Sequence, residues 1–211
     1  MLQEEPTGKR GQMKSDIVTL KYGNTRTFLL RGASGNLLID TDYAGTLQAF
    51  FREIKAEGIT LNEIDWVVAT HYHPDHCGLI GQLQKQGVQL LLLDSQVDAV
   101  HYSDYIFARE KLDYVPVDSA KATIVSANES RRFMEKLGIE GEIVRTVSHS
   151  EDSVSLILDD GNCFVGDLEP REYIEAYGDN APLADDWKMI MSRNPGFIHY
   201  AHAPARMIGS L

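Results

Sequence analysis

The most informative stretch of the sequence is His71-Tyr72-His73-Pro74-Asp75-His76-Cys77. Four of its side chains can bind a metal ion, and they fall within six positions. Residues two apart in an extended segment point the same way, so His71 and His73 can reach one cation together. Pro74 then turns the chain and directs Asp75 and His76 elsewhere. The stretch therefore predicts one loop that serves two adjacent metal ions.

The run IDWVVAT (64–70) comes directly before this stretch. A short, largely apolar run that ends abruptly in polar residues is typical of a strand buried on both faces. Imidazole nitrogens and carboxylate oxygens form a ligand set that zinc prefers and that iron and manganese also accept. The alternative interpretation is an accidental cluster of surface histidines, with Asp75 as an ordinary N-cap of a helix over GLIGQLQ (78–84).

A metal site needs ligands beyond one loop, and four further histidines occur in the chain: His101, His149, His199 and His202. His149 lies between two predicted strands, where a loop side chain can reach the same edge as the first cluster. Asp167 follows another predicted strand, and Gly166 before it permits a close approach of the backbone. His101 is expected at the surface.

Short apolar runs separated by turns predict strands over much of the chain. The first three strands are expected to pair antiparallel: DIVTLKY (16–22), TFLLRG (27–32) and NLLIDT (36–41). A further buried strand is predicted at VQLLLLD (88–94). Four later strands are predicted at EIVRTV (142–147), SVSLILDD (153–160), NCFVG (162–166) and FIHYA (197–201). Helices are predicted at 44–58, 78–87 and 184–191, and residues 95–137 are expected to be mainly helical with an interruption at Pro116. Two strand-rich blocks, each accompanied by helices, predict an α/β sandwich.

Composition limits the kind of partner. The chain has 211 residues, and 43% hydrophobic with 24% charged residues is the usual mixture of a globular protein. We expect a flexible tail at 1–15 and one domain at 16–211. A net charge of −11 argues against nucleic acid and anionic membranes as partners. The two cysteines, the polar N-terminal stretch and the absence of a long apolar run favour a cytoplasmic location.

The order of these motifs resembles the metallo-β-lactamase superfamily. The resemblance rests on HxHxDH, on His149 before a strand, on Gly166-Asp167 after a strand and on a histidine near the C-terminus. NLLIDT and TVSHSEDSVSLIL are also similar to elements of that family. The ligand set is similar to that of its two-metal hydrolases, such as glyoxalase II and the lactonases. The resemblance implies a four-layer αβ/βα sandwich, with the metal site at one edge between two mixed sheets.

The resemblance also implies two divalent metal ions, zinc in the first place and iron or manganese as alternatives. Two triads of side chains would hold the two ions, and one aspartate would bridge them: His71, His73 and His149; Asp75, His76 and His202; and Asp167. His202 is preferred to His199 because HYAHAP (199–204) is similar to the family's Y-P-G-H-G-P turn. His199 is expected inside a strand.

The implied activity is hydrolysis of a small ester, thioester or lactone by a hydroxide that bridges the metals. Asp75 would take up the released proton besides binding metal, and Asp40 either orients a ligand histidine or caps a turn. True β-lactamases carry a cysteine at the position of Asp167, which argues against antibiotic hydrolysis.

Three alternatives stay open: iron-dependent redox chemistry, phosphodiester cleavage and a non-catalytic metal-binding sensor. Flavodiiron proteins normally have a glutamate at the position of His73, which argues against that branch. The expected partner is a small-molecule substrate. The oligomeric state is open, with a homodimer as one option.

Overall fold

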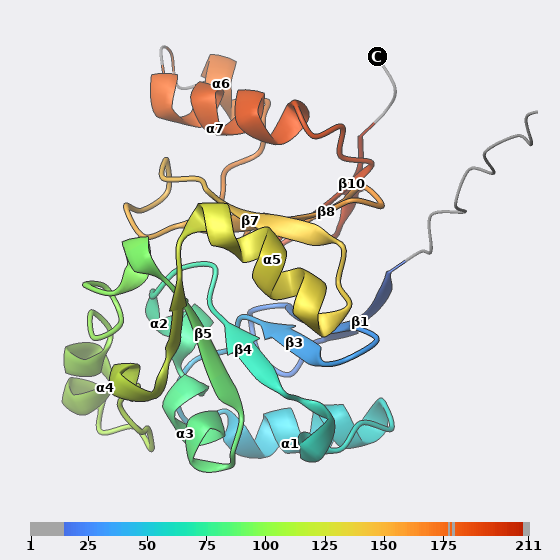
Figure 1. The fold of residues 1–211 in the computed structure, drawn as a ribbon. Helices are drawn as coiled ribbons and strands as arrows, with labels where there is room; N and C mark the ends of the chain where they lie inside the picture. Colours follow the sequence, from blue (N-terminus) through green and yellow to red (C-terminus); the bar gives the residue numbers. More distant parts are fainter. Residues whose placement is uncertain (1–14, 177, 179, 209–211) are drawn as a thin grey trace, which may run out of the picture.

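Two mixed β-sheets face each other across the centre of the molecule, and helices cover their outer sides (Figure 1). The computed structural model describes residues 15–176, 178 and 180–208. The layers follow one another as helix, sheet, sheet and helix, so the fold is the four-layer α/β sandwich that the resemblance implies. Among the described residues, no helix has the length and apolar character needed to cross a membrane.

The first sheet has six strands, in the order β1 (Asp16–Leu20), β2 (Thr27–Arg31), β3 (Asn36–Ile39), β4 (Trp66–Val68), β5 (Gln89–Leu93) and β6 (Thr123–Val125). Strands β1 to β3 are antiparallel, as predicted, and β3 to β6 are parallel. Side chains alternate between the two faces of each strand. Leu38 packs toward the outer helices, whereas Leu37 and Ile39 pack toward the second sheet. The apolar runs of the inner strands β2 to β5 are therefore buried on both faces.

The second sheet has five strands, in the order β11 (Arg206–Met207), β10 (Phe197–His199), β9 (Asn162–Phe164), β8 (Val154–Leu158) and β7 (Gly141–Arg145). Only β9 and β10 run parallel among these neighbours. Leu156 faces the first sheet, and Ile157 faces the outer helix layer.

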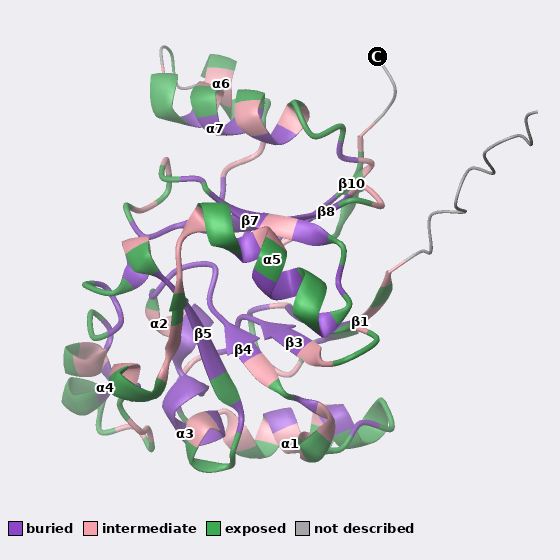
Figure 2. Cartoon of the chain, in the orientation of Figure 1, coloured by how far each residue is buried: buried purple, intermediate pink, exposed green. Residues whose placement is uncertain are grey.

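Seven α-helices occur among the described residues: α1 (Leu47–Ala56), α2 (Pro74–Cys77), α3 (Ile80–Lys85), α4 (Asp104–Glu110), α5 (Ala127–Leu137), α6 (Tyr173–Ala176) and α7 (Ala181–Met191). Helices α1 and α3 pack on the first sheet, and α7 packs on the second through the fully buried Trp187. Helix α5 lies beside the two sheets (Figure 1), and its Phe133 and Met134 join the core between them. Buried residues follow the strands and the inward faces of the helices (Figure 2).

The prediction that residues 95–137 are mainly helical is wrong for part of that segment. Residues 112–118 are irregular, and β6 extends the first sheet beside β5. Strand β6 has only three residues and leaves Ile124 half exposed at the sheet edge. A run this short carries no periodicity that distinguishes it from a loop or a helix.

The predicted tail at 1–15 lies outside the described residues except for Ser15. The backbone N–H of Ser15 donates a hydrogen bond to Asp160. The short elements α6 and β11 were not predicted either, because their four and two residues are too few for a pattern.

Candidate metal centre

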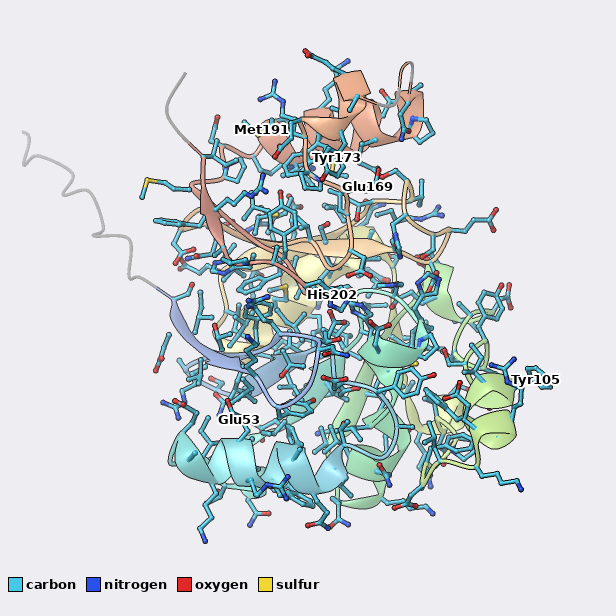
Figure 3. The ribbon with its side chains drawn as sticks, turned by 180° about the vertical axis from the view of Figure 1, so that it is seen from behind. Glu53, Tyr105, Glu169, Tyr173, Met191 and His202 are labelled. Atoms are coloured by element: carbon cyan, nitrogen blue, oxygen red, sulfur yellow. The ribbon has the colours of Figure 1, made fainter. Side chains whose placement is uncertain are left out.

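The predicted site residues lie at one edge of the sandwich, each shortly after the end of a strand and, apart from Asp75 and His76 in the short helix α2, on loops: Asp40 after β3, residues 71–76 after β4, His149 after β7, Asp167 after β9 and His202 after β10. The carboxyl ends of the parallel strands in an α/β sheet are the usual place for a ligand site. The side-chain view from behind shows His202 between the two sheets (Figure 3). Both sheets therefore contribute to one site.

The first group of candidate ligands consists of His71, His73 and His149. Their ligand atoms all lie within 4.8 Å of one another. Nε2 of His149 is 3.1 Å from Nδ1 of His73, although the two residues come from different sheets. Two ligands at about 2.0–2.1 Å from a tetrahedral zinc ion are roughly 3.3 Å apart. The spacing of these nitrogens therefore suits a shared cation.

The second group consists of Asp75, His76 and His202. Oδ2 of Asp75 lies 3.1 Å from Nε2 of His202 and 3.9 Å from Nε2 of His76. Helix α2 begins at Pro74, so Asp75 and His76 leave the extended direction of His73. This turn places the two halves of the motif in different groups.

Asp167 lies between the two groups and directs one oxygen toward each. Oδ1 is 3.3 Å from Nε2 of His76 and 3.2 Å from Nε2 of His202. Oδ2 is 3.9 Å from Nε2 of His71 and 3.8 Å from Nε2 of His149. A carboxyl group in this position can contact two cations at once.

Several buried atoms of this cluster lack a hydrogen bond of good geometry, namely His71 Nε2, His76 Nε2 and Asp167 Oδ1. The nearby charged groups contact them only at ion-pair distance. Leaving a buried polar atom without a partner costs about 1–3 kcal/mol. One cation in each group would give all three atoms a partner, because His71 Nε2 belongs to the first group and His76 Nε2 and Asp167 Oδ1 face the second. Imidazole with carboxylate is the donor set of zinc, iron and manganese sites. The residues present therefore fit a metal centre.

Electrostatics within the protein set the protonation of the cluster. Burial lowers the pKa of His71 to about 2. Burial also opposes the charged form of His76, but Asp40 and Asp167 outweigh it and raise the pKa to about 10. Close contacts with the carboxylates of Asp167 and Asp75 raise the pKa of His202 to about 10. Burial opposes ionisation of Asp167, yet the imidazoles of His202 and His76, whose Nε2 atoms lie 3.2 and 3.3 Å from its Oδ1, hold the pKa of that carboxyl well below its usual range.

Asp40 is buried behind the second group. Its Oδ2 lies 3.0 Å from Nδ1 of His76, and its Oδ1 accepts a hydrogen bond of 2.6 Å from the backbone N–H of Thr70. The Thr70 hydroxyl lies within 3.0 Å of both carboxyl oxygens. An imidazole bonded through Nδ1 presents Nε2 to a metal. Asp40 thus contacts a candidate ligand directly and also holds the chain before His71.

Gly166 allows the loop that carries Asp167 to approach Thr70. Its φ is +56°, and a Cβ atom there would lie 2.4 Å from the Thr70 hydroxyl oxygen. Only glycine adopts a left-handed conformation at such close range without strain. The close approach expected at Gly166 is confirmed.

The loop between β1 and β2 supports the second group, although the sequence predicts only two strands there, separated by a turn. Nδ1 of His202 lies 3.2 Å from the carbonyl oxygen of Asn24. The Thr25 hydroxyl donates to the carbonyl oxygen of Asp75 over 2.8 Å. Contacts made through backbone carbonyl oxygens do not require a particular side chain. The sequence therefore indicates only a turn at Gly23-Asn24 and not its contacts with the site.

The remaining histidines lie elsewhere. His199 is in β10, where it bonds to Asn162 and stacks on Phe164. His101 is exposed and pairs with Asp104. The two cysteines, Cys77 and Cys163, are buried and free.

Comparison with known proteins adds a family match. The sequence profile of the Metallo-beta-lactamase superfamily matches residues 21–204. The chain is 28% identical over 184 residues to "Beta-lactamase-like protein 2 homolog" of Drosophila melanogaster, covering 84% of this chain and 58% of that protein. It is 31% identical over 101 residues to "Putative diflavin flavoprotein A 2" of Synechocystis sp., covering 47% of this chain and 16% of that protein. The chain therefore spans less than two thirds of the length of these curated relatives.

A solved structure has a similar fold. "TTHA1623 in a di-iron-bound form" superposes with a TM-score of 0.67 at 20% identity, over 91% of this chain and 94% of that chain. At this identity the likeness concerns the fold alone.

Proposed function

The chain belongs to the metallo-beta-lactamase superfamily, and from this membership and the geometry of its site we propose that it is a hydrolase that uses two divalent cations. The proposed substrate is a small ester, thioester or lactone. The observation that carries the proposal is the position of Asp167, with one oxygen facing each group of ligands. In this proposal seven side chains hold the two cations: His71, His73, His149, Asp75, His76, His202 and Asp167.

Two divalent cations a few Å apart lower the pKa of a shared water toward neutrality and polarise a carbonyl oxygen. The chain's own residues orient that chemistry. Asp40 holds His76 through Nδ1 and so keeps its Nε2 directed at the site. Asp75 is partly exposed, and its Oδ2 lies 3.1 Å from His202. It is placed to accept the proton that a water molecule releases.

The net charge of the chain and the residue type at position 167 limit the class of substrate that we propose. Its net charge of −11 repels a polyanion, so we propose a small molecule rather than nucleic acid. Asp167 stands where true β-lactamases carry a cysteine, which favours ester, thioester or lactone cleavage over antibiotic hydrolysis. We propose zinc as the working metal.

The test is a hydrolysis assay of the purified chain with two equivalents of zinc against a panel of esters, thioesters, lactones and small phosphodiesters. His73→Ala should reduce kcat/KM on the order of 10²-fold or more, because it removes a ligand of the first cation. His101→Ala is the matched control, since that exposed histidine is not a candidate ligand and pairs with Asp104. The proposal fails if the chain binds two cations and cleaves no member of the panel. If the chain cleaves only the phosphodiesters, the proposed enzyme is a phosphodiesterase and not an esterase, thioesterase or lactonase.

Iron-dependent redox chemistry is the second candidate. Its support is the likeness to a diflavin flavoprotein and to a structure in a di-iron-bound form. His73 stands where flavodiiron proteins normally have a glutamate, which argues against that branch. Metal analysis after expression with both zinc and iron supplied, followed by measurement of oxygen uptake, decides between the candidates. Two iron ions per chain together with oxygen uptake would favour redox chemistry and count against hydrolysis.

A further inference from the structure

Asp152 is buried between the two loops that carry the first group of candidate ligands. It is 5% exposed. Its Oδ2 accepts a hydrogen bond of 2.7 Å from the backbone N–H of Tyr72, and its Oδ1 accepts one of 2.7 Å from the Ser150 hydroxyl. Tyr72 is the residue between His71 and His73, and Ser150 follows His149 directly. One carboxyl group thus bonds next to all three histidines of the group.

The Tyr72 backbone is held at its carbonyl end as well. The Ser103 hydroxyl donates to the Tyr72 carbonyl oxygen over 2.7 Å. The Tyr72 ring is only 1% exposed and packs in the core. Tyr72 faces the core, whereas the ligand atoms of His71 and His73 lie together with that of His149, so a fixed Tyr72 holds both flanking histidines at the site.

The backbone of Asp152 is tied to the end of β4 by Gln96, which is fully buried. Nε2 of Gln96 donates to the carbonyl oxygens of Ala69 and Asp152 over 3.0 and 3.1 Å. The backbone N–H of Val154 also donates to the carbonyl oxygen of Thr70 over 2.8 Å. Asp152 therefore lies where the two sheets are joined by hydrogen bonds.

We propose that Asp152 is a positioning residue that sets the distance between His73 and His149 and thereby the affinity of the first metal site. The inference rests on the proposed function. His73 and His149 come from different sheets, yet their nitrogens lie 3.1 Å apart. A buried carboxyl group is tolerated only when it is hydrogen-bonded, and both bonds of Asp152 go to the ligand loops. Removing its side chain takes away the link that joins the two ligand loops directly beside the histidines and leaves the Tyr72 N–H without its acceptor.

The experiment measures metal binding rather than activity. Zinc titration gives the stoichiometry and the Kd of each site, and cobalt(II) supplies a visible spectrum that reports coordination geometry. Asp152→Ala should weaken binding of one cation about 10–100-fold, as the loss of partners behind metal ligands does. The other cation should bind with unchanged affinity. Asp152→Asn should stay close to the native protein, because its amide oxygen accepts from Tyr72 and its NH₂ group donates to Ser150.

Asp160→Ala is the matched control, because Asp160 accepts hydrogen bonds from the backbone N–H groups of Ser15 and Asn162 at the turn between β8 and β9. It should lower thermal stability without changing either Kd. If Asp152→Ala does not fold, Ser150→Ala decides, since it removes one of the two bonds and should weaken the same site by a smaller factor.

The inference is overturned if Asp152→Ala, or Ser150→Ala in its place, binds both cations with native affinity. It is also overturned if the Asp160→Ala control weakens metal binding to the same extent. A native chain that binds both cations and hydrolyses nothing contradicts the proposed function alone.

Discussion

Asp40 and Asp152 support the candidate ligands from behind in two different ways. Asp40 contacts the imidazole of His76 itself, whereas Asp152 bonds to the backbone beside His71 and His73. The contact of Asp40 determines which imidazole nitrogen of His76 faces the metal site. The contact of Asp152 fixes the position of the backbone that carries His71 and His73. A metal centre needs both, because ligand distances vary by only a few tenths of an ångström.

Asp40→Asn tests the contact to His76. Asparagine tolerates the left-handed backbone of this position, where φ is +59°, so the chain should fold. Its amide oxygen can still accept from the Thr70 N–H, but its NH₂ group then faces Nδ1 of His76. We expect the affinity of the second cation to fall about 10–100-fold, measured by zinc titration.

The control for this change is Asp65→Asn, which alters an aspartate that accepts from the backbone N–H of Asn36 outside the site. Equal metal affinities in the native chain and in Asp40→Asn would contradict the assigned role of Asp40.

At the scale of elements, the helix termini carry clear local signals. Helix α5 begins after Ser126, which forms a capping box with Glu129, and it ends at Gly138 with φ +76°. The Ser126 hydroxyl and the Ser126 backbone N–H both contact the Glu129 carboxyl group, at 2.7 and 3.0 Å. This helix lies beside both sheets, so its stability bears on how they are held together.

Ser126→Ala should destabilise the fold by about 0.5–2 kcal/mol, the usual cost of losing an N-cap. Metal affinity should not change, because α5 contributes no candidate ligand. Urea denaturation gives the free energy of unfolding, and Ser34→Ala at an exposed loop serine is the control. If Ser126→Ala lowers the free energy of unfolding no more than Ser34→Ala does, the N-cap does not contribute to the stability of the fold.

At the scale of the whole molecule, the candidate ligands come from loops of both sheets. Residues 71–76 follow β4 in the first sheet, whereas His149, Asp167 and His202 belong to the second. A cation bound between them connects the two halves of the sandwich. Metal binding should therefore stabilise the native state against unfolding.

Removal of metal by a chelator should lower Tm. Restoring zinc at about 100 times Kd should add about 2.7 kcal/mol per site, a rise of roughly 5–10 °C for a chain of this size. At one fixed zinc concentration, the increment should be larger at pH 8 than at pH 6. On protein contacts alone, His76 and His202 have pKa values raised to about 10 and carry protons that the cation must displace.

The direction of this pH dependence follows from the raised pKa values of His76 and His202. Without metal, the stabilisation from protonated His76 and His202 is complete below the unfolded pKa of about 6.5 and is lost as pH rises toward about 10. With metal, a rise in pH removes competing protons, so the metal-induced increment grows. Scanning calorimetry at the two pH values measures both, and an increment independent of pH would contradict the assignment of these two ligands.

The sequence by itself predicted the features that depend on neighbouring residues. The cluster from His71 to His76 is visible because its ligands fall within six positions, and the long strands are visible from their apolar runs. The resemblance carried by these motifs implied the sandwich, which the structure confirms. It also implied the further ligands, and the structure brings those side chains together at one edge.

Only the tertiary structure decided which distant groups meet. The contact between His73 and His149 joins residues 76 positions apart, and that between Asp152 and Tyr72 joins residues 80 apart. The short strand β6 likewise exists through pairing with β5 and not through its own three residues. Local patterns report periodicity and turn chemistry, whereas such contacts depend on how two packed sheets face each other. For that physical reason the supporting role of Asp152 became visible only in three dimensions.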